Sequence, residues 1–124
     1  MTLIDRDLRA WLYRICRSEK PPSSVVAYNV GLSETAFGGY AASLIGADRY
    51  VPDDPDWACD ESFAPSERFF PIPAGVFSDW ELVQEAVAAA VRDFVRSPEG
   101  DCSFLASAEA VTVGFDDGDL VRVR

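Results

Sequence analysis

The sequence predicts one α+β domain over residues 1–124, a mostly antiparallel sheet of about four to five strands with two helices packed on one face. Three observations predict this fold. Two stretches have the apolar spacing of amphipathic helices. Several short stretches alternate apolar side chains with small or polar ones, as half-buried strands do. The 124 residues are 48% hydrophobic and include eight Phe, which suits a single compact core.

Residues 4–18 carry the pattern of the first helix. Their apolar side chains recur at the spacing of one helical face: Ile4, Leu8, Trp11, Leu12 and Ile15. A stripe of this kind is what a helix packed on a sheet presents to the core. The helix must end before Pro21 and Pro22, because proline lacks the amide hydrogen that helix continuation needs.

Three strands are predicted in the first half of the chain. Residues 25–32 alternate as a strand does, and residues 40–46 predict a returning strand after a loop that contains Gly38 and Gly39. Residues 68–72 predict a short strand. Pro71 confines that strand to a sheet edge or a bulge, because proline cannot donate a ladder hydrogen bond.

Residues 79–97 give the clearest helical signal. Ser78 and Glu81 have the spacing of a capping box, and Phe77 has the spacing to pack on Leu82. The expected apolar stripe follows: Trp80, Val83, Val87, Val91 and Phe94. Ser97 and Pro98 end the helix.

Residues 111–123 predict a hairpin that turns at Asp117 and Gly118. A two-residue turn would pair Val113 with Arg122. A three-residue loop would pair Val113 with Val123 and give a more uniform apolar face, so the hydrophobic pattern favours it. The register stays open.

Charge and composition exclude several classes of function. A net charge of −10 disfavours binding to nucleic acid or to an anionic membrane. No apolar run is long enough for a signal peptide or a membrane span, so we expect a cytoplasmic protein. The three cysteines are expected to be reduced thiols. Ten Arg against one Lys indicate a GC-rich bacterial source.

The chain contains no histidine. This excludes catalytic triads that use histidine and zinc sites that use histidine ligands. No glycine-rich phosphate loop is present, and no cysteine spacing suits a metal. We therefore predict no catalytic residues, no metal and no cofactor, and the chain is more typical of a non-enzyme.

The most unusual stretch is residues 48–61, here named the acidic loop. It holds six acids and one base, so its net charge of −5 is half of the total of −10. Carboxylates around an aromatic anchor are typical of a surface that binds a basic protein. The candidate partner-binding residues are Asp53, Asp54, Asp56, Trp57, Asp60 and Glu61.

Other interpretations of the acidic loop stay open. It could be a merely solvated loop that Trp57 and Phe63 hold to the body of the protein. Its acids are numerous enough for calcium, but they lack the spacing and the glycine of a calcium-binding helix-loop-helix motif. Trp57 could serve as the anchor for a partner or as the pin that fixes the loop.

The middle of the chain resembles known proteins. The stretches VAYNVGLSET, GYAASLIGADRY and DDPDWACDESFAPSERFF resemble small uncharacterised bacterial proteins, some of which look like immunity proteins that neutralise secreted toxins. The resemblance covers about residues 25–70 and implies binding to a toxin. It implies no catalytic residue.

Together these features predict a non-enzymatic protein that binds a partner with a basic surface, as an immunity or inhibitor protein does. The alternative is a small-molecule binder or a carboxylate-based enzyme with a pocket between the sheet and the second helix. A deep site lined by Tyr28 or Tyr40 and converging acids would favour that alternative. The oligomeric state stays open.

Overall fold

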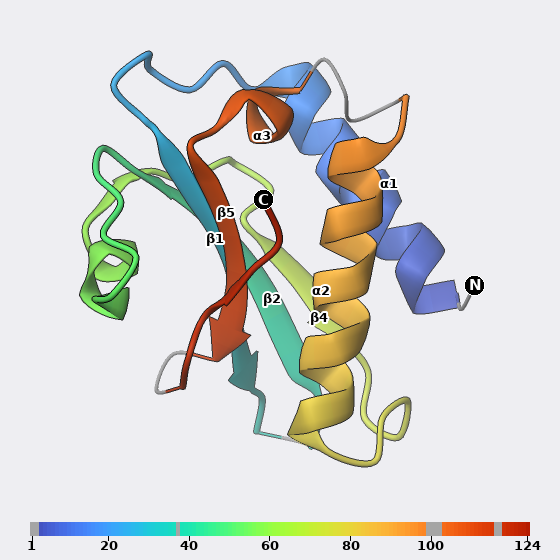
Figure 1. Cartoon of the computed structure of the whole chain (residues 1–124). Helices are drawn as coiled ribbons and strands as arrows, with labels where there is room; N and C mark the ends of the chain where they lie inside the picture. Colours follow the sequence, from blue (N-terminus) through green and yellow to red (C-terminus); the bar gives the residue numbers. More distant parts are fainter. Residues whose placement is uncertain (1–2, 37, 99–102, 116–117) are drawn as a thin grey trace.

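The computed structural model of the chain describes residues 3–36, 38–98, 103–115 and 118–124 (Figure 1). The elements follow in this order: α1 (Leu3–Ser18), β1 (Ala27–Glu34), β2 (Tyr40–Ala47), the 3₁₀-helix η1 (Pro55–Cys59), β3 (Glu61–Phe63), β4 (Phe69–Ile72), α2 (Trp80–Arg96), α3 (Phe104–Ser107), β5 (Ala110–Phe115) and β6 (Val121–Arg122). Among these residues no helix is long and apolar enough to cross a bilayer.

The strands form one six-stranded mixed sheet in the order β3-β2-β1-β5-β6, with β4 pairing with β2 as well. β1 and β5 are parallel, and the other pairs are antiparallel. The predicted α+β class is confirmed, but the sheet is larger than expected and is not purely antiparallel. The parallel pair arises because the chain returns through α2 before β5, and a parallel neighbour needs such a crossover.

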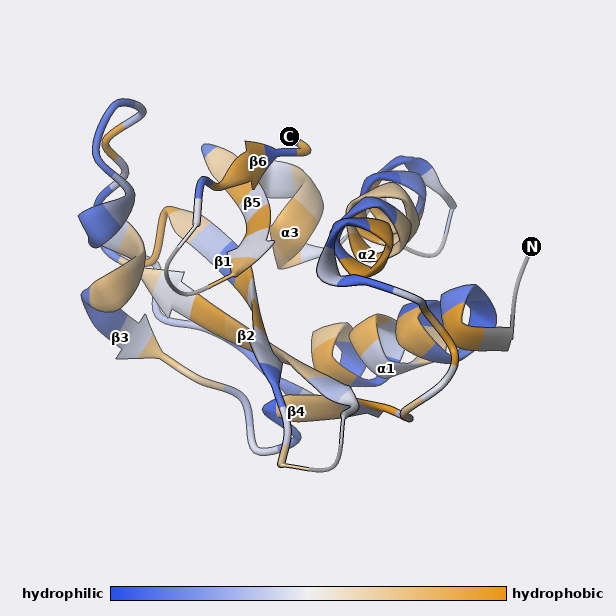
Figure 2. Cartoon of the chain, turned by 90° about the horizontal axis from the view of Figure 1, so that it is seen from below, coloured by the Kyte–Doolittle hydropathy of each residue, from blue (hydrophilic) through white to orange (hydrophobic). Residues whose placement is uncertain are grey.

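The two long helices cover one face of the sheet (Figure 2). The space between them and the sheet is filled by apolar side chains, among them Trp11, Leu44, Val91 and Phe94, each 0–1% exposed. The Trp11 indole N–H also donates to the carbonyl of Glu67 at 2.8 Å, which ties α1 to the segment before β4. The acidic loop lies on the opposite face.

The predicted stripes of both helices are largely confirmed. In α1 the last four side chains of the predicted stripe, Leu8 to Ile15, are buried. Ile4, the first of them, is partly buried against the core. In α2 the stripe is buried from Val83 onward, but Trp80 is 49% exposed. The prediction that Trp80 belongs to the buried stripe was therefore wrong: this first residue of α2 packs edge-on against Phe115 at the margin of the core, and half of its side chain stays exposed.

The start of α2 differs from the expected capping box. The N-cap is Asp79, whose carboxylate accepts from the backbone N–H of Leu82 at 3.0 Å. Ser78 therefore lies one residue before the cap. Leu82 is 42% exposed, and Phe77 packs against the main core. Either Ser or Asp caps a helix well, so the sequence alone could not choose between two adjacent residues.

The C-terminal hairpin has neither of the two expected registers. Val113 pairs with Val121, and Thr112 pairs with Arg122. This register still places valine opposite valine, as the apolar pattern required, but it is two residues away from the favoured one. Residues 116–117 of the expected turn lie outside the described residues.

Strand β4 is an edge strand, as Pro71 predicted. Within the described part of the chain it pairs with β2 alone, where Pro71 lies opposite Ala41. The acidic loop contains η1 and leads directly into β3.

Candidate functional site

The acidic loop is held against the sheet by Trp57. This side chain is 1% exposed and lies in a small cluster of its own with Ala27, Ala47 and Ala110, one alanine from each of three neighbouring strands. Three short side chains leave room for the indole on the sheet face that the helices do not cover. Tyr50 packs edge-on against it, with 5.2 Å between ring centroids. Trp57 is therefore the pin of the loop.

Local hydrogen bonding explains the turn that delivers Trp57. The carboxylate of Asp54 accepts from the backbone N–H of Asp56 at 3.0 Å and caps η1. Pro55 occupies the start of η1, where a missing amide hydrogen costs nothing. One of the predicted partner-binding carboxylates thus has a structural role within its own loop.

Two further carboxylates of the loop are paired with arginines. Asp60 accepts from Nε of Arg49 at 2.7 Å, and Glu61 lies 2.6 Å from a terminal nitrogen of Arg68. The hydrogen bond that Arg49 donates to Asp60 raises the pKa of the Arg49 guanidinium. Both pairs are solvent-accessible, so each contributes little to stability. Their main effect is to fix where these side chains lie.

The remaining predicted carboxylates, Asp53 and Asp56, are exposed. Their carboxylates accept no hydrogen bond and form no ion pair with any described residue. The acidic loop carries a net charge of −5, and counting the paired Arg68 leaves −4. Among the predicted partner-binding carboxylates, Asp53 and Asp56 are therefore the ones most available to an outside cation.

A cleft separates the acidic loop from the end of the C-terminal hairpin; we name it the loop–hairpin cleft. Its volume is ≈ 430 Å³. The loop contributes Asp56 and Ala58 to its lining, and the hairpin contributes Phe115, Asp119 and Leu120. A second concavity of ≈ 270 Å³ shares Pro55, Asp119 and Leu120 with it and contains Asp53. The two concavities therefore adjoin, and Asp119 is an acidic residue that the sequence analysis did not select.

Asn29 forms part of the lining of the loop–hairpin cleft from the central strand β1. It is 8% exposed, and its side-chain oxygen accepts from the hydroxyl of Thr112 at 2.9 Å. Thr112 is its partner in the register of the parallel pair. A buried asparagine in the middle of a strand is unusual, because strands disfavour it.

Apolar core side chains fill the space between the sheet and the second helix, where the alternative prediction expected a pocket. Tyr28 is 2% exposed, and burial raises its pKa to about 12. Tyr28 does line a concavity of ≈ 500 Å³ elsewhere, together with Phe104 and Glu109. A concavity of ≈ 540 Å³ does lie near the start of α2, where Glu34, Trp80, Gln84 and Phe115 contribute to its lining. Tyr40 packs edge-on against Phe115 and does not line that concavity.

Metal and thiol chemistry find little support in the described residues. No three Asp, Glu or Cys side chains there are grouped as a metal site requires. Cys59 is an exposed free thiol at the end of η1. Burial raises the pKa of the Cys16 thiol to about 11, which keeps it protonated at neutral pH. Cys102 lies outside the described residues.

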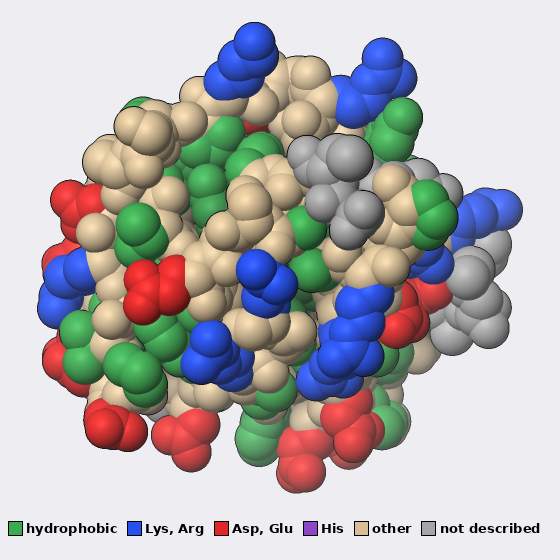
Figure 3. All heavy atoms as spheres, turned by 45° about the horizontal axis from the view of Figure 1, so that its top comes forward, with side chains coloured by type: hydrophobic (Ala, Val, Ile, Leu, Met, Phe, Trp, Pro, Cys, Tyr) green, Lys and Arg blue, Asp and Glu red, His purple; other side chains and the backbone are tan. Residues whose placement is uncertain are grey.

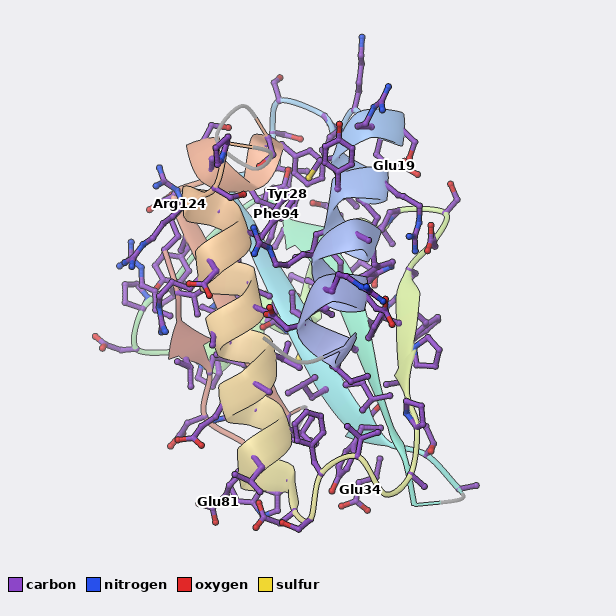
Figure 4. All side chains as sticks on the ribbon, turned by 90° about the vertical axis from the view of Figure 1, so that its right-hand side faces the viewer. Glu19, Tyr28, Glu34, Glu81, Phe94 and Arg124 are labelled. Atoms are coloured by element: carbon purple, nitrogen blue, oxygen red, sulfur yellow. The ribbon has the colours of Figure 1, made fainter. Side chains whose placement is uncertain are left out.

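Acidic and basic side chains both occur on the face that Figure 3 shows. Asp and Glu side chains are most numerous along its lower rim, and others lie beside Lys and Arg side chains at the left and right. In Figure 4, Glu34 and Glu81 lie at one end of the molecule, and Glu19 and Arg124 lie toward the other.

No protein-family model, no curated protein and no solved structure matched this chain. The resemblance to immunity proteins therefore stays a prediction, and the argument about function rests on the geometry of the acidic loop.

Proposed function

We propose that the protein works by binding another protein, one with a basic surface, through the acidic loop. The observation that carries this proposal is the contrast within the loop. Trp57 is 1% exposed and fixes the loop, whereas Asp53 and Asp56 beside it are exposed and lack a partner among the described residues. The loop thus holds unpaired negative charge in a fixed place.

A pinned loop suits fast and specific association. Little conformational freedom is lost when a partner binds a segment that is already ordered. Clustered carboxylates attract a basic partner over about a Debye length, ~10 Å at 0.1 M salt, and so raise the association rate. In this proposal Trp57 positions the loop and does not itself contact the partner.

The class of partner follows from the same charge. An acidic inhibitor is complementary to an enzyme that binds a polyanion, because such an enzyme presents a basic surface. Neutralisation of a basic toxin, as immunity proteins perform it, is the form of this function that also agrees with the resemblance of residues 25–70.

The experiment is a comparative capture from the lysate of the host. The bait is the wild-type chain, the loop variant Asp53→Asn/Asp56→Asn or the control variant Glu85→Gln/Asp93→Asn. The control removes the same two charges from the exposed side of α2, on the opposite face of the sheet. The captured proteins are identified and then purified for direct binding measurements.

We expect a basic protein that wild type and the control variant retain and that the loop variant loses. Equal retention by all three chains, or no basic protein retained at low and moderate salt, would contradict the proposal.

A further inference from the structure

The concavity at the start of α2, here named the α2 concavity, lies where two parallel strands end. Its volume is ≈ 540 Å³, and its lining consists of Glu34, Trp80, Gln84, Phe115, Gly118 and Asp119. Glu34 is the last residue of β1 and Phe115 the last of β5, so the carboxyl ends of this parallel pair meet beside the start of α2 (Figure 1). Ligands of open sheets with parallel strands commonly bind outside the carboxyl ends of the strands. The volume also lies within the usual range of small-molecule sites, roughly 300–1,000 Å³.

Two aromatic rings at a right angle form walls of the α2 concavity. Trp80 packs edge-on against Phe115, with 5.8 Å between ring centroids and 86° between ring planes. Phe115 in turn packs edge-on against Tyr40, at 5.9 Å. These contacts fix the Trp80 indole although it is 49% exposed, so a ligand can contact the rings without first ordering them.

The charge around the two rings favours a cation. Glu34 lines the α2 concavity from the end of β1 and Asp119 from the C-terminal hairpin, and both are exposed. None of the described residues that line it is a lysine or an arginine. The carboxylate of Asp79 already caps the N-terminus of α2, so this helix end does not offer a free site for an anion.

The aromatic walls decide which kind of cation fits. Ring faces attract a cation through their negative quadrupole, and sites for quaternary ammonium groups use this attraction. A lysine-type ammonium is compact and strongly hydrated, so it loses more hydration when it contacts a ring. A metal ion would need converging oxygen ligands, and no group of three Asp, Glu or Cys in the described ranges provides them.

We propose that the α2 concavity binds a small molecule that carries a trimethylammonium group. The methyl groups contact the rings of Trp80 and Phe115, and the carboxylates of Glu34 and Asp119 balance the positive charge. The inference goes beyond the proposed function and does not depend on the acidic loop, so either of the two proposals can fail without the other.

The three tryptophans provide a direct probe. Each gives one indole N–H signal in a nitrogen-15 NMR spectrum, and Trp80→Phe identifies the signal of Trp80 by removing it. Trp11 and Trp57 are 0–1% exposed and serve as internal controls. The labelled protein is titrated with choline chloride, with neohexyl alcohol, which is the uncharged carbon isostere of choline, and with sodium chloride, all at millimolar concentrations. Cosedimentation with phosphatidylcholine vesicles tests the same headgroup in a membrane.

We expect choline to shift the Trp80 signal saturably while the other two indole signals stay in place. The Kd of neohexyl alcohol should be about fivefold higher, as the loss of one exposed cation–π contact implies, and sodium chloride should leave the signal unmoved. Vesicles should not retain the protein, because the concavity takes a free small molecule.

Variants separate the two parts of the site. Glu34→Gln/Asp119→Asn should raise the Kd of choline about fivefold, since it removes both charges that balance the cation. Asp93→Asn/Glu109→Gln removes the same charge near the opposite ends of α2 and β5 and should leave the Kd unchanged. In Trp80→Ala the side-chain amide of Gln84, the one glutamine of the chain, reports on the concavity and should no longer respond to choline.

A Trp80 signal that ignores choline, that responds equally to neohexyl alcohol, or that moves together with those of Trp11 and Trp57 would overturn the inference. An equal change of the Kd in the two charge variants would also overturn it, as would a Gln84 amide that still responds in Trp80→Ala. Retention by vesicles without a response to free choline would assign the concavity to a membrane headgroup and contradict a small-molecule site.

Discussion

The three tryptophans show how one residue type takes different roles according to its surroundings. Trp11 and Trp57 are each 0–1% exposed, whereas Trp80 is 49% exposed. The sequence placed Trp80 in the core stripe of α2 and left the role of Trp57 open. Helical spacing could not reveal that the first residue of α2 lies at the margin of the core and stays half exposed. The three alanines that receive Trp57 are far apart in sequence, so no local pattern marked them.

We expect Trp57→Ala to lower the free energy of unfolding by about 3–5 kcal/mol, the usual range for removing a buried tryptophan. Trp80→Ala should lower it by less than about 1 kcal/mol, because half of that side chain is already in water. Urea unfolding followed by circular dichroism measures both. Limited proteolysis should then cleave within residues 48–61 in the Trp57 variant only. Equal losses in the two variants would contradict the assignment of Trp57 as the pin.

Cys16 and Tyr28 predict how stability depends on alkaline pH. Burial raises the pKa of Cys16 to about 11 and that of Tyr28 to about 12. In the unfolded chain these groups titrate near about 8.5 and 10. As pH rises above 8.5 the unfolded state therefore loses protons that the folded state keeps, and stability falls until the folded groups also ionise.

The free energy of unfolding should thus decrease between about pH 8.5 and pH 12, and Cys16→Ala should make the decrease shallower. Urea unfolding under reducing conditions at intervals over this range provides the comparison. General charge repulsion affects the wild type and the Cys16→Ala variant alike. If the free energy of unfolding fell equally with pH in the two proteins, the Cys16 thiol would not be buried as described.

At the scale of the elements, the spacing of apolar residues predicted most of the helices and strands. Both long helices, the β1–β2 hairpin and the edge position of β4 were expected from apolar spacing and from Pro71. The direction of β5 was not expected, because alternation is the same in parallel and antiparallel strands. The pairing of Val113 with Val121 was also missed, since several registers place valine opposite valine.

The cap of α2 provides a test at this scale. Asp79→Ala should lower the free energy of unfolding by about 1 kcal/mol, because it removes the hydrogen bond to the Leu82 amide. Ser78→Ala should change it by less than about 0.5 kcal/mol, since Ser78 lies before the cap. Urea denaturation midpoints distinguish the two. A larger decrease in the free energy of unfolding for Ser78→Ala than for Asp79→Ala would contradict Asp79 as the N-cap and favour the capping box expected from the sequence.

For the whole molecule, the candidate site depends on an arrangement that no single segment contains. The helices cover one sheet face, and the acidic loop is pinned to the other by Trp57 (Figure 2). The negative charge of residues 48–61 was evident from the sequence. The sequence did not show which of these carboxylates form ion pairs within the chain. Arg49 and Arg68 become their partners only when η1 and β3 set the path of the loop.

The fold also brings residues from three distant parts of the chain together beside the acidic loop. Asn29, Asp56 and Asp119 line one cleft. The sequence analysis selected neither Asn29 nor Asp119, because neither belongs to a local motif. Their proximity follows from the β1–β5 pairing, which brings the C-terminal hairpin beside the loop.

The most direct test of the account is the association rate of the purified partner with the Asp53→Asn/Asp56→Asn chain, compared with Glu85→Gln/Asp93→Asn, at low and at moderate salt. We expect the loop variant to associate about tenfold more slowly than wild type at low salt, with the difference shrinking as salt screens the charges. The control variant should stay close to wild type at both salt concentrations. Equal slowing in the two variants would mean that only net charge matters, and would contradict a docking role for the acidic loop.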